Sequence, residues 1–421
     1  MTSGDIVSLT IEKPAAGGRM IARVDGQVVL VSGAIPGERV RARIGRVSKR
    51  VAYADLTAID EPSADRRDET ADPQCGGCLY AHIAYPRQLD IKRAVIVDAF
   101  TRIGRIELPG GGDALRVAAS PEHGYRMRAR LHVRGGRVGF FREGTHELCD
   151  ARQTRQLLPA TSDALDRIAD ALRAAGSDAI REIDLAENLD ASDRVVALEA
   201  AETPNRDVTD RLAAVNGLTG VVSGPHVHGS AHVVDRLAVG AREITLRRHV
   251  LAFFQGNRHL LRDLVSHVVA QTQSDGEAID LYAGVGLFSA SAAIASGIRV
   301  TAVEGDRVAA SDLEANARAS GAAIVVVHDA VERFVRRRPA SATRPSTVIV
   351  DPPRTGMSRE ALDGALALGA PRIVYVSCDV ATLARDARRI VDAGFAVHRV
   401  DGFDLFPNTP HVETVVVFER V

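Results

Sequence analysis

The first 60 residues alternate between apolar and polar positions in short runs that end at turn-forming residues. These runs cover residues 7–11, 19–24, 27–31, 38–44 and 51–59, and turn signals separate them at Gly17-Gly18, Asp25-Gly26 and Pro36-Gly37. Alternation with a period of two is typical of strands that bury one face. Five such strands in so short a stretch predict a small β-barrel of the OB type over residues 1–60.

The last part of the chain shows a different pattern, in which short apolar runs alternate with helical periodicity. The predicted strands cover residues 278–282, 299–303, 324–328, 346–350 and 372–377. Strands that alternate with helices form a doubly wound α/β sheet, which we expect over residues 250–421. Residues 61–249 mix helix, strand and loop and predict an α+β central domain. An amphipathic helix over residues 86–105 is expected to pack on the α/β domain.

Two predicted strands carry arginines at every second position, so that each strand presents one basic face. The basic residues are Arg39, Arg41 and Arg43 in the first strand and Arg126, Arg128, Arg130, His132 and Arg134 in the second. Gly135-Gly136 then predicts a hairpin turn into a strand with two phenylalanines. Basic residues beside aromatic ones are typical of surfaces that bind single-stranded or flipped-out bases. A solvated face that prevents edge-to-edge association is the alternative at both strands.

Composition and charge limit the classes of protein that this chain can belong to. The chain has 421 residues, of which 46% are hydrophobic and 25% charged, and its net charge is −1. It can therefore fold into two or three domains, and a nucleic-acid surface would have to be local. The N-terminus lacks the pattern of a signal peptide, and no apolar run approaches the ~18 residues that cross a bilayer. With only four cysteines, these features predict a cytoplasmic protein with no membrane partner.

Glycines and carboxylates follow the predicted strands of the α/β domain, where a ligand would bind. Gly284 and Gly286 lie in the turn after the first strand, and such a turn lets the backbone approach a cofactor. Glu304 ends the second strand, where a carboxylate can bind ribose hydroxyls. Asp329 follows the third strand and Asp351 the fourth. The carboxyl edge of this sheet is thus a candidate cofactor site.

Cys378 lies where a predicted strand ends and a helix begins, in the stretch YVSCDVATLARD. The carboxyl ends of parallel strands face the ligand crevice, and a helix N-terminus favours the thiolate form of a cysteine. Cys378 is therefore a candidate nucleophile, with a buried structural cysteine as the alternative.

Two further cysteines, Cys75 and Cys78, flank a pair of glycines in the sequence CGGC. This spacing suits two soft ligands of a metal ion or a cluster, with glycines that let the backbone fold around it. A redox dithiol is less favoured, because no βαβ pattern of the thioredoxin type surrounds the motif.

Taken together, the motifs resemble the RNA 5-methyluridine methyltransferases that use S-adenosylmethionine. The matching segments, in chain order, are FFQGN, DLYAGVGLFS, Glu304, DPPRTG, YVSCDVATLARD and HVE, and the N-terminal segment SGAIPGERV resembles a TRAM domain. The resemblance implies a Rossmann-like class I methyltransferase domain. It is strongest to the branch that modifies uridines of 23S ribosomal RNA. The bacterial branch that modifies transfer RNA is the alternative.

This resemblance implies a role for each matching residue. Cys378 would add to carbon 6 of the target uracil, and Glu413 would remove the proton from carbon 5. S-adenosylmethionine would be the methyl donor, and RNA the partner, with no obligate protein partner inferred. The residues expected to hold the donor are Gln255, Tyr282, Glu304, Asp329 and Asp351.

The chain also departs from the family pattern at two places. Relatives with a 4Fe-4S cluster have four cysteine ligands, whereas this chain matches three, Cys75, Cys78 and Cys149, and has Glu69 at the fourth position. The resemblance therefore implies either a cluster with three thiolate ligands or a remnant without iron. Asp379 stands where relatives have asparagine, and its charge is expected to oppose a low pKa of the Cys378 thiol.

Two other classes of protein remain to be weighed. An amino-group methyltransferase with a DPPY motif would share the two prolines, but it needs an aromatic residue where this chain has Arg354, and it has no use for Cys378. A non-catalytic RNA-binding protein with a degenerate methyltransferase fold is the second alternative. The presence of Cys378, Glu413 and the cofactor carboxylates argues against it.

Overall fold

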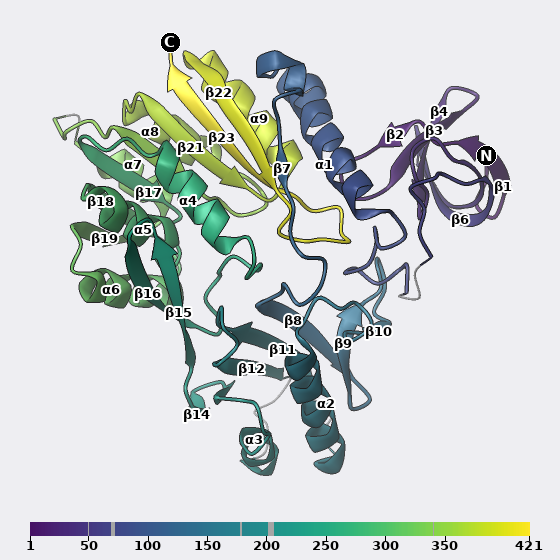
Figure 1. Cartoon of the computed structure of the whole chain (residues 1–421), viewed down its shortest axis with the longest axis horizontal. Coiled ribbons are helices and arrows are strands. Elements are labelled where there is room, and N and C mark those ends of the chain that lie inside the picture. The colour runs from purple at the N-terminus through teal and green to yellow at the C-terminus, as the bar shows by residue number, and fades with distance from the viewer. Residues whose placement is uncertain (49, 69–71, 177–178, 201–205, 340) are drawn as a thin grey trace.

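The computed structural model describes residues 1–421 except residues 49, 69–71, 177–178, 201–205 and 340. Figure 1 shows three groups of strands, one near each end of the sequence and one between them. The N-terminal strands are purple, the central ones blue to teal, and the C-terminal ones green to yellow. In the described part of the chain, no helix is both long enough and apolar enough to cross a membrane.

The N-terminal group is a curved six-stranded sheet with the strand order β1-β5-β6-β4-β3-β2. Its strands are β1 (Ile6–Thr10), β2 (Lys13–Pro14), β3 (Met20–Val24), β4 (Gln27–Ser32), β5 (Arg39–Ser48) and β6 (Val51–Glu61). In β5 the arginines are exposed, whereas Val40, Ala42 and Ile44 are buried, which confirms the predicted alternation. All five strands expected from the pattern are present. The short strand β2 was missed, because two residues leave no periodicity to detect.

A linker and one long helix connect this sheet to the rest of the molecule. Helix α1 (Tyr85–Ala99) has Pro86 in its first turn, where the missing backbone N–H costs nothing. A π-helical turn, η1 (Phe100–Gly104), and a 3-10 turn, η2 (Pro109–Gly112), follow. Val95, Ile96 and Ala99 of α1 are buried in the core of the C-terminal sheet. One turn before Val95 in the same helix, Ile91 packs in the core of the N-terminal sheet.

The central group is a seven-stranded sheet with the order β10-β9-β8-β11-β12-β13-β14. Its strands are β8 (Arg128–Arg134), β9 (Arg137–Phe141), β10 (Leu148–Asp150), β11 (Ile180–Glu187), β12 (Arg194–Ala200), β13 (Gly220–Ser223) and β14 (His226–Gly229). Helices α2 (Pro159–Ala174) and α3 (Arg206–Ala213) supply Leu165, Ile168 and Leu212 to its core. The hairpin predicted at Gly135-Gly136 is present as β8 and β9.

The C-terminal group is an eight-stranded mixed sheet with the order β19-β18-β17-β20-β21-β23-β22-β7. Its strands are β7 (Val117–Ala118), β17 (Glu277–Leu281), β18 (Arg299–Glu304), β19 (Ile324–His328), β20 (Thr347–Val350), β21 (Arg372–Ser377), β22 (Phe395–Phe403) and β23 (Glu413–Arg420). The helices are α4 (Leu261–Gln271), α5 (Leu287–Ser296), α6 (Arg307–Ser320), α7 (Val331–Arg337), α8 (Arg359–Ala367) and α9 (Val380–Asp392). The separate ribbon of β15 (His232–Val239) and β16 (Arg242–His249) packs against this domain. Strands β17 to β21 are parallel, as expected for a doubly wound fold.

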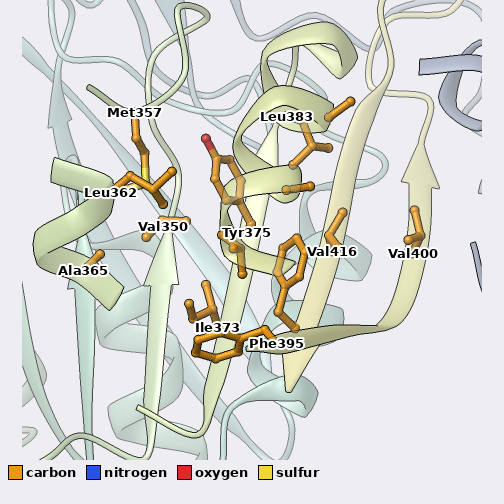
Figure 2. Close-up of a cluster of buried hydrophobic side chains, with 14 of the residues drawn as sticks. Val350, Met357, Leu362, Ala365, Ile373, Tyr375, Leu383, Phe395, Val400 and Val416 are labelled. Carbon is orange, nitrogen blue, oxygen red and sulfur yellow. The ribbon is translucent and has the colours of Figure 1, made fainter. Parts of the chain in front are cut away.

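Both faces of this sheet are buried, which explains the apolar runs in its strands. On one face, residues of α1, α8 and α9 form a core with strand residues such as Ile373 and Tyr375. Figure 2 shows part of this core, with Leu362 and Leu383 directed toward the strand side chains between them. The other face is covered by α4 and α5 and by the ribbon. The helices therefore fix the strands, and the loops at the carboxyl edge of the sheet are free to form a site.

Candidate active site

Cys378 lies between the end of β21 and the start of α9, as the sequence predicted. Its side chain is partly buried. Asp379 caps the helix, because its Oδ1 accepts hydrogen bonds from the backbone N–H groups of Ala381 and Thr382. The sharp change from strand to helix therefore holds Cys378 at the carboxyl edge of the sheet.

Helix α9 also holds the loop of the DPPR motif next to this cysteine. The buried carboxylate of Asp386 accepts hydrogen bonds from the Met357 N–H at 2.9 Å and from the Tyr375 hydroxyl at 2.8 Å. The Thr382 hydroxyl donates to the carbonyl of Arg354 at 3.2 Å. These contacts fix the loop after β20, and its Arg354 guanidinium lies close enough to Cys378 to hydrogen-bond its sulfur.

The charges around Cys378 decide how readily it forms a thiolate. Burial, followed by the negative charge of Glu413, raises the pKa of the Cys378 thiol to about 11, and Arg354 opposes the rise. Asp351 adds to the repulsion. The sequence had pointed to Asp379 as the opposing carboxylate, but that group is turned toward the helix N-terminus, and Glu413 and Asp351 oppose the thiolate instead.

Glu413 is the first residue of β23 and comes to Cys378 through strand pairing. Strands β21 and β23 are antiparallel, and Ser377 is paired with Thr414, so Cys378 and Glu413 are the next residues along the two strands. The Glu413 side chain is only 2% exposed. Burial, reinforced by repulsion from Asp351, raises the pKa of this carboxyl well above its usual range, whereas Arg354 lowers it. A base and a thiol that are 35 residues apart in sequence thus share one cation.

A second group of carboxylates lies beneath this pair, at the ends of β17 and β20. Asp351 accepts a hydrogen bond from the Gln255 amide at 3.1 Å. Burial and the negative charge of Asp280 raise the pKa of Asp351 to about 7. Burial likewise raises the pKa of Asp280 to about 7, although the Ser289 hydroxyl donates to it. The Oδ1 atom of Asp280 is buried without a hydrogen-bond partner in the structure, so this pair suits a cationic or hydrogen-bond-donating ligand.

The remaining residues expected to hold the cofactor follow the same edge. Glu304 accepts hydrogen bonds from the N–H groups of Gly284 and Asp306, at 2.7 and 2.6 Å. Tyr282 adopts a left-handed backbone conformation with φ 64°, an uncommon state for a residue other than glycine. It lines a cavity of about 540 Å³ together with Pro353 and other residues of the loop after β20. The carboxylates along this edge accept hydrogen bonds and offset positive charge, which fits S-adenosylmethionine, because that molecule presents a sulfonium, an amino group and ribose hydroxyls.

Asp329, the remaining residue expected to hold the cofactor, also forms ion pairs within the protein. It follows β19, as predicted, but its carboxylate is bound by Arg333 and lies 3.4 Å from an Arg337 nitrogen on α7. These ion pairs lower the pKa of Asp329 and occupy its oxygens. Asp329 is therefore at the predicted edge with its acceptors already engaged.

Three residues at this site were not singled out by the sequence. Asp280 opens the DLYAGVGLFS motif. The only feature that could have indicated its role is its position on the strand next to the one that Asp351 follows. Arg354 was noted only for not being aromatic, yet its charge acts on both Cys378 and Glu413. His411 was noted only as part of HVE. Burial, followed by the charge of Arg354, lowers the pKa of His411 to about 4, so the imidazole is neutral at pH 7.

The cysteines outside this site are arranged in a way that the sequence did not predict. Cys75 and Cys149 form a disulfide with a Cα–Cα distance of 5.8 Å, and Cys78 is buried in the same core. Gly77 allows the Gln156 side chain to pack closely against this motif, because a Cβ on Gly77 would lie 1.8 Å from Gln156 Nε2. Glu69 lies outside the described residues. In the part of the chain that the structure describes, no three potential metal ligands are grouped as a site.

The expected iron-sulfur cluster therefore does not fit this arrangement. Two of its three cysteine ligands are bonded to each other, and a sulfur in a disulfide is not the thiolate that binds iron. The disulfide instead links the segment before α1 to the edge strand β10 of the central sheet.

The two basic strand faces are partly neutralised by neighbouring carboxylates. Arg39 pairs with Glu61 and Arg41 with Asp60 on β6, each at 3.1 Å, whereas Arg43 is exposed. On β8, Arg130 pairs with Asp184 of β11.

The start of the basic hairpin is joined directly to the cofactor edge. The Met127 N–H donates to the carbonyl of Gly256 at 2.9 Å, which places the hairpin next to the FFQGN segment. Phe253 of this segment is 60% exposed, and the Arg128 guanidinium lies 5.7 Å from its ring centre. An exposed aromatic ring beside an arginine is a platform on which a nucleic-acid base can stack.

Comparisons with known proteins match the whole length of the chain. A model of the tRNA (Uracil-5-)-methyltransferase family matches residues 226–421, and a TRAM domain model matches residues 2–57. The 23S rRNA (uracil(1939)-C(5))-methyltransferase RlmD of Halomonas elongata is 33% identical, over 98% of this chain and 89% of the relative. The enzyme of the same name from Pseudomonas putida is 30% identical, over 98% and 93%.

One solved structure has the same fold over nearly the whole chain. It is the Pyrococcus abyssi tRNA (uracil-54, C5)-methyltransferase in complex with S-adenosyl-L-homocysteine, with a TM-score of 0.77 and 21% identity. The match covers 97% of this chain and 99% of that one. It confirms the class I methyltransferase fold with an N-terminal barrel.

Proposed function

The chain belongs to the family of S-adenosylmethionine-dependent RNA (uracil-C5) methyltransferases, and from this premise we propose that its target is a uridine of 23S ribosomal RNA. Two relatives, which match over 89% and 93% of their length at 33% and 30% identity, carry that name. The observation that carries the proposed chemistry is the pairing of β21 with β23, which brings Cys378 and Glu413 together beside Arg354.

Carbon 5 of uracil is a weak nucleophile and must be activated before it can accept a methyl group. The Cys378 sulfur forms a bond to carbon 6, and the electron pair of the 5,6 double bond moves toward carbon 5 and the carbonyl at carbon 4. Arg354 favours this step, because its positive charge stabilises the thiolate. S-adenosylmethionine supplies the methyl group as an electrophile.

The second half of the reaction restores both the double bond and the cysteine. Glu413 removes the proton from carbon 5, the double bond forms again, and the bond between sulfur and carbon 6 breaks. The raised pKa of Glu413 suits this role, since a carboxylate with a raised pKa holds the abstracted proton better than an exposed carboxylate does.

The residues that would hold the donor are those at the carboxyl edge. We propose that Gln255, Tyr282, Glu304, Asp329 and Asp351 hold it together with Asp280. Arg333 already shares the charge of Asp329, so that residue would contribute less than Asp351. The target base would have to leave its stack to reach Cys378, and Phe253 with Arg128 offers a stacking surface at the entrance.

The cysteines support a proposal different from the iron-sulfur cluster. We assign Cys75 and Cys149 to a cross-link that fixes the segment before α1 to the central sheet. We also propose a cytoplasmic location, where the RNA substrate would be met, with no membrane partner. In that reducing compartment the cross-link depends on its burial, since Cys75 is 1% and Cys149 5% exposed.

The test is methylation of defined RNAs by the purified protein. Unmodified 23S ribosomal RNA and unmodified transfer RNA are each incubated with S-adenosylmethionine, then digested with nuclease and searched for 5-methyluridine by mass spectrometry. We expect one modified uridine in the ribosomal RNA and none in the transfer RNA. Modification of the transfer RNA alone would assign the chain to the alternative substrate, and no 5-methyluridine in either would contradict the proposed chemistry.

A further inference from the structure

The loop between β22 and β23, residues 404–410, reaches away from the eight-stranded sheet toward the other two parts of the molecule. In Figure 1 it is the yellow loop at the centre, below β7 and between α1 and the central strands. It leads directly into His411 and Glu413. The loop therefore sits between the base of the proposed reaction and the rest of the protein.

Helix α1 holds the beginning and the end of this loop with buried polar side chains. Lys92 is 1% exposed, and its Nζ lies 2.5 Å from Asp404 Oδ1 and 3.1 Å from the carbonyl of Phe406. The buried Gln88 side chain donates to Asn408 Oδ1 and accepts from the Asn408 N–H, both at 2.9 Å. A charge and an amide are costly to bury, so these pairs define one position of the loop closely.

Groups outside the loop bind four successive backbone carbonyls of it. The Asn257 amide donates to Leu405 O at 3.0 Å and Lys92 to Phe406 O at 3.1 Å. The Tyr125 hydroxyl donates to Pro407 O at 3.3 Å and the Tyr80 N–H to Asn408 O at 2.9 Å. These donors come from the FFQGN segment, from α1, from the start of the central domain and from the segment before α1. All the parts that surround the loop thus fix its backbone.

The N-terminal barrel contacts the last residue of the loop. Gly18 lies in the turn between β2 and β3, with φ +97°, and a Cβ at this position would come within 2.9 Å of Pro410 Cγ. Gly17, with φ +88°, has nothing within 4 Å of its Cβ position. Of these two glycines, only Gly18 packs on the loop. Its contact is Pro410, which lies three residues before β23 begins at Glu413.

We propose that residues 404–410 are a positioning loop for Glu413, and that Gly18, Gln88 and Lys92 act on the reaction through it. This proposal rests on the proposed function, because it assigns how the base of that reaction is aligned. Between Asp404 and Glu413 there is no glycine and there are two prolines, so a shift of Pro410 passes along the chain to the base. Proton removal needs the carboxylate within hydrogen-bond reach of carbon 5, whereas attack by Cys378 depends on Glu413 only through its charge, which a small displacement changes little. Seating of the barrel would therefore control release of the product more than formation of the covalent intermediate.

The test compares Gly18→Ala with Gly17→Ala. Both replacements place alanine at a positive φ, so their backbone strain is matched, but only the first displaces Pro410. For Gly18→Ala we expect turnover of methylated RNA to fall between about ten- and a hundredfold. The rate of covalent trapping by 5-fluorouridine RNA and the KM for RNA should remain near the wild-type values. Denaturing gels should show accumulated protein-RNA adduct on natural RNA. Gly17→Ala should behave like the wild type in all three measurements.

A second pair of variants separates alignment from stability. Lys92→Met leaves Asp404 buried without its cation and should unfold more easily, whereas Lys92→Met with Asp404→Leu replaces the pair by apolar side chains and should recover stability. The double variant still lacks the tie between α1 and Phe406 O, which then keeps, among the described residues, only the Thr409 hydroxyl of the loop itself as a side-chain donor, so we expect its adduct to accumulate although its melting temperature is restored. Equal turnover in Gly17→Ala, Gly18→Ala and the double variant would overturn the positioning role. If the wild type itself forms no adduct with 5-fluorouridine RNA, the proposed function fails instead.

Discussion

The carboxyl edge of the eight-stranded sheet and the cysteine group of the central domain each bring together residues that are far apart in sequence, but they leave those residues in opposite states. At the edge, burial raises the pKa values of the Asp280 and Asp351 carboxyls to about 7, and one Asp280 oxygen has no partner in the structure. In the cysteine group, Cys75 and Cys149 are bonded to each other. The first arrangement leaves a carboxylate oxygen open to a ligand, whereas the second joins two sulfur atoms to each other. The state of the reactive atoms therefore distinguishes a site from a structural cross-link where motifs alone do not.

The largest effect on the catalytic edge is expected from Glu413→Gln. Without its base the enzyme should release product between about a hundred- and ten-thousandfold more slowly, and the adduct should accumulate. The amide also removes a charge that raises the pKa of the Cys378 thiol. The pKa of the thiol should fall, so the pH profile of covalent trapping by 5-fluorouridine RNA should move to lower pH while turnover is lost. The trapping rate is measured from pH 6 to pH 10, and a profile that moves upward or stays in place would contradict the assigned charges.

A smaller effect is expected from Asp351→Asn, which keeps the shape of the side chain and removes its charge. We expect S-adenosylmethionine to bind about tenfold more weakly, which is ~1.4 kcal/mol. The affinity for S-adenosylhomocysteine should fall less, since its thioether sulfur carries no positive charge. Calorimetric titration with both compounds measures the difference. Asp329→Asn serves as the control, because Arg333 already engages that carboxylate, and an equal difference in both variants would show that Asp351 does not recognise the charge.

The stability of the cysteine group in the central domain should depend on its disulfide and not on iron. Reduction of denatured protein should expose two additional thiols per chain, and loss of the disulfide in Cys75→Ala/Cys149→Ala should lower the free energy of unfolding by about 2–4 kcal/mol. Methylation of RNA should change less than twofold, because neither residue contacts the edge. Anaerobically purified protein should lack stoichiometric iron. A brown protein with about four irons per chain would instead show that the cluster forms and that the cross-link is not its native state.

The smallest effect is expected from the arginines of β5, where a paired arginine lies beside one without an ion pair in the described part of the chain. Arg41 is paired with Asp60, whereas in the described part of the chain no carboxylate lies within ion-pair distance of Arg43. If this face follows an RNA backbone, Arg43→Gln should flatten the salt dependence of RNA binding by about one unit of slope. Arg41→Gln should change it less. Identical slopes for both variants and the wild type would identify the face as solvated only.

Sequence periodicity predicted most of the fold, because the inner strands of the α/β sheet are buried on both faces and the apolar runs of its strands are long enough to detect. The boundaries of β19 and β21 agree with the expected residues. The pairing of β21 with β23, which joins Cys378 to Glu413, could not follow from periodicity, since an antiparallel partner leaves no mark on spacing. Only the resemblance to a known family predicted that Cys378 and Glu413 act together.

What the sequence could not predict depends on contacts across the chain. Whether Cys75 binds a metal or bonds to Cys149 is decided by their separation in space, and a C-x-x-C spacing is the same in both cases. Likewise, the arginines of β5 and β8 alternate as predicted, but their neutralisation depends on which acidic residues the neighbouring strands place beside them. The role of Arg354 is a third case, because its charge matters only once β20 and β21 lie next to each other.

The central claim is that Cys378 forms a covalent bond to the target uridine, and trapping with a fluorinated RNA tests it most directly. A 23S ribosomal RNA fragment that contains 5-fluorouridine is incubated with the protein and S-adenosylmethionine, and the complex is digested and mapped by mass spectrometry. Fluorine cannot leave carbon 5 as a proton does, so the adduct should persist. We expect one RNA-linked peptide, which contains Cys378, and no linked peptide from Cys378→Ser. A stable adduct at another residue, or unchanged methylation of natural RNA by Cys378→Ser, would contradict the account.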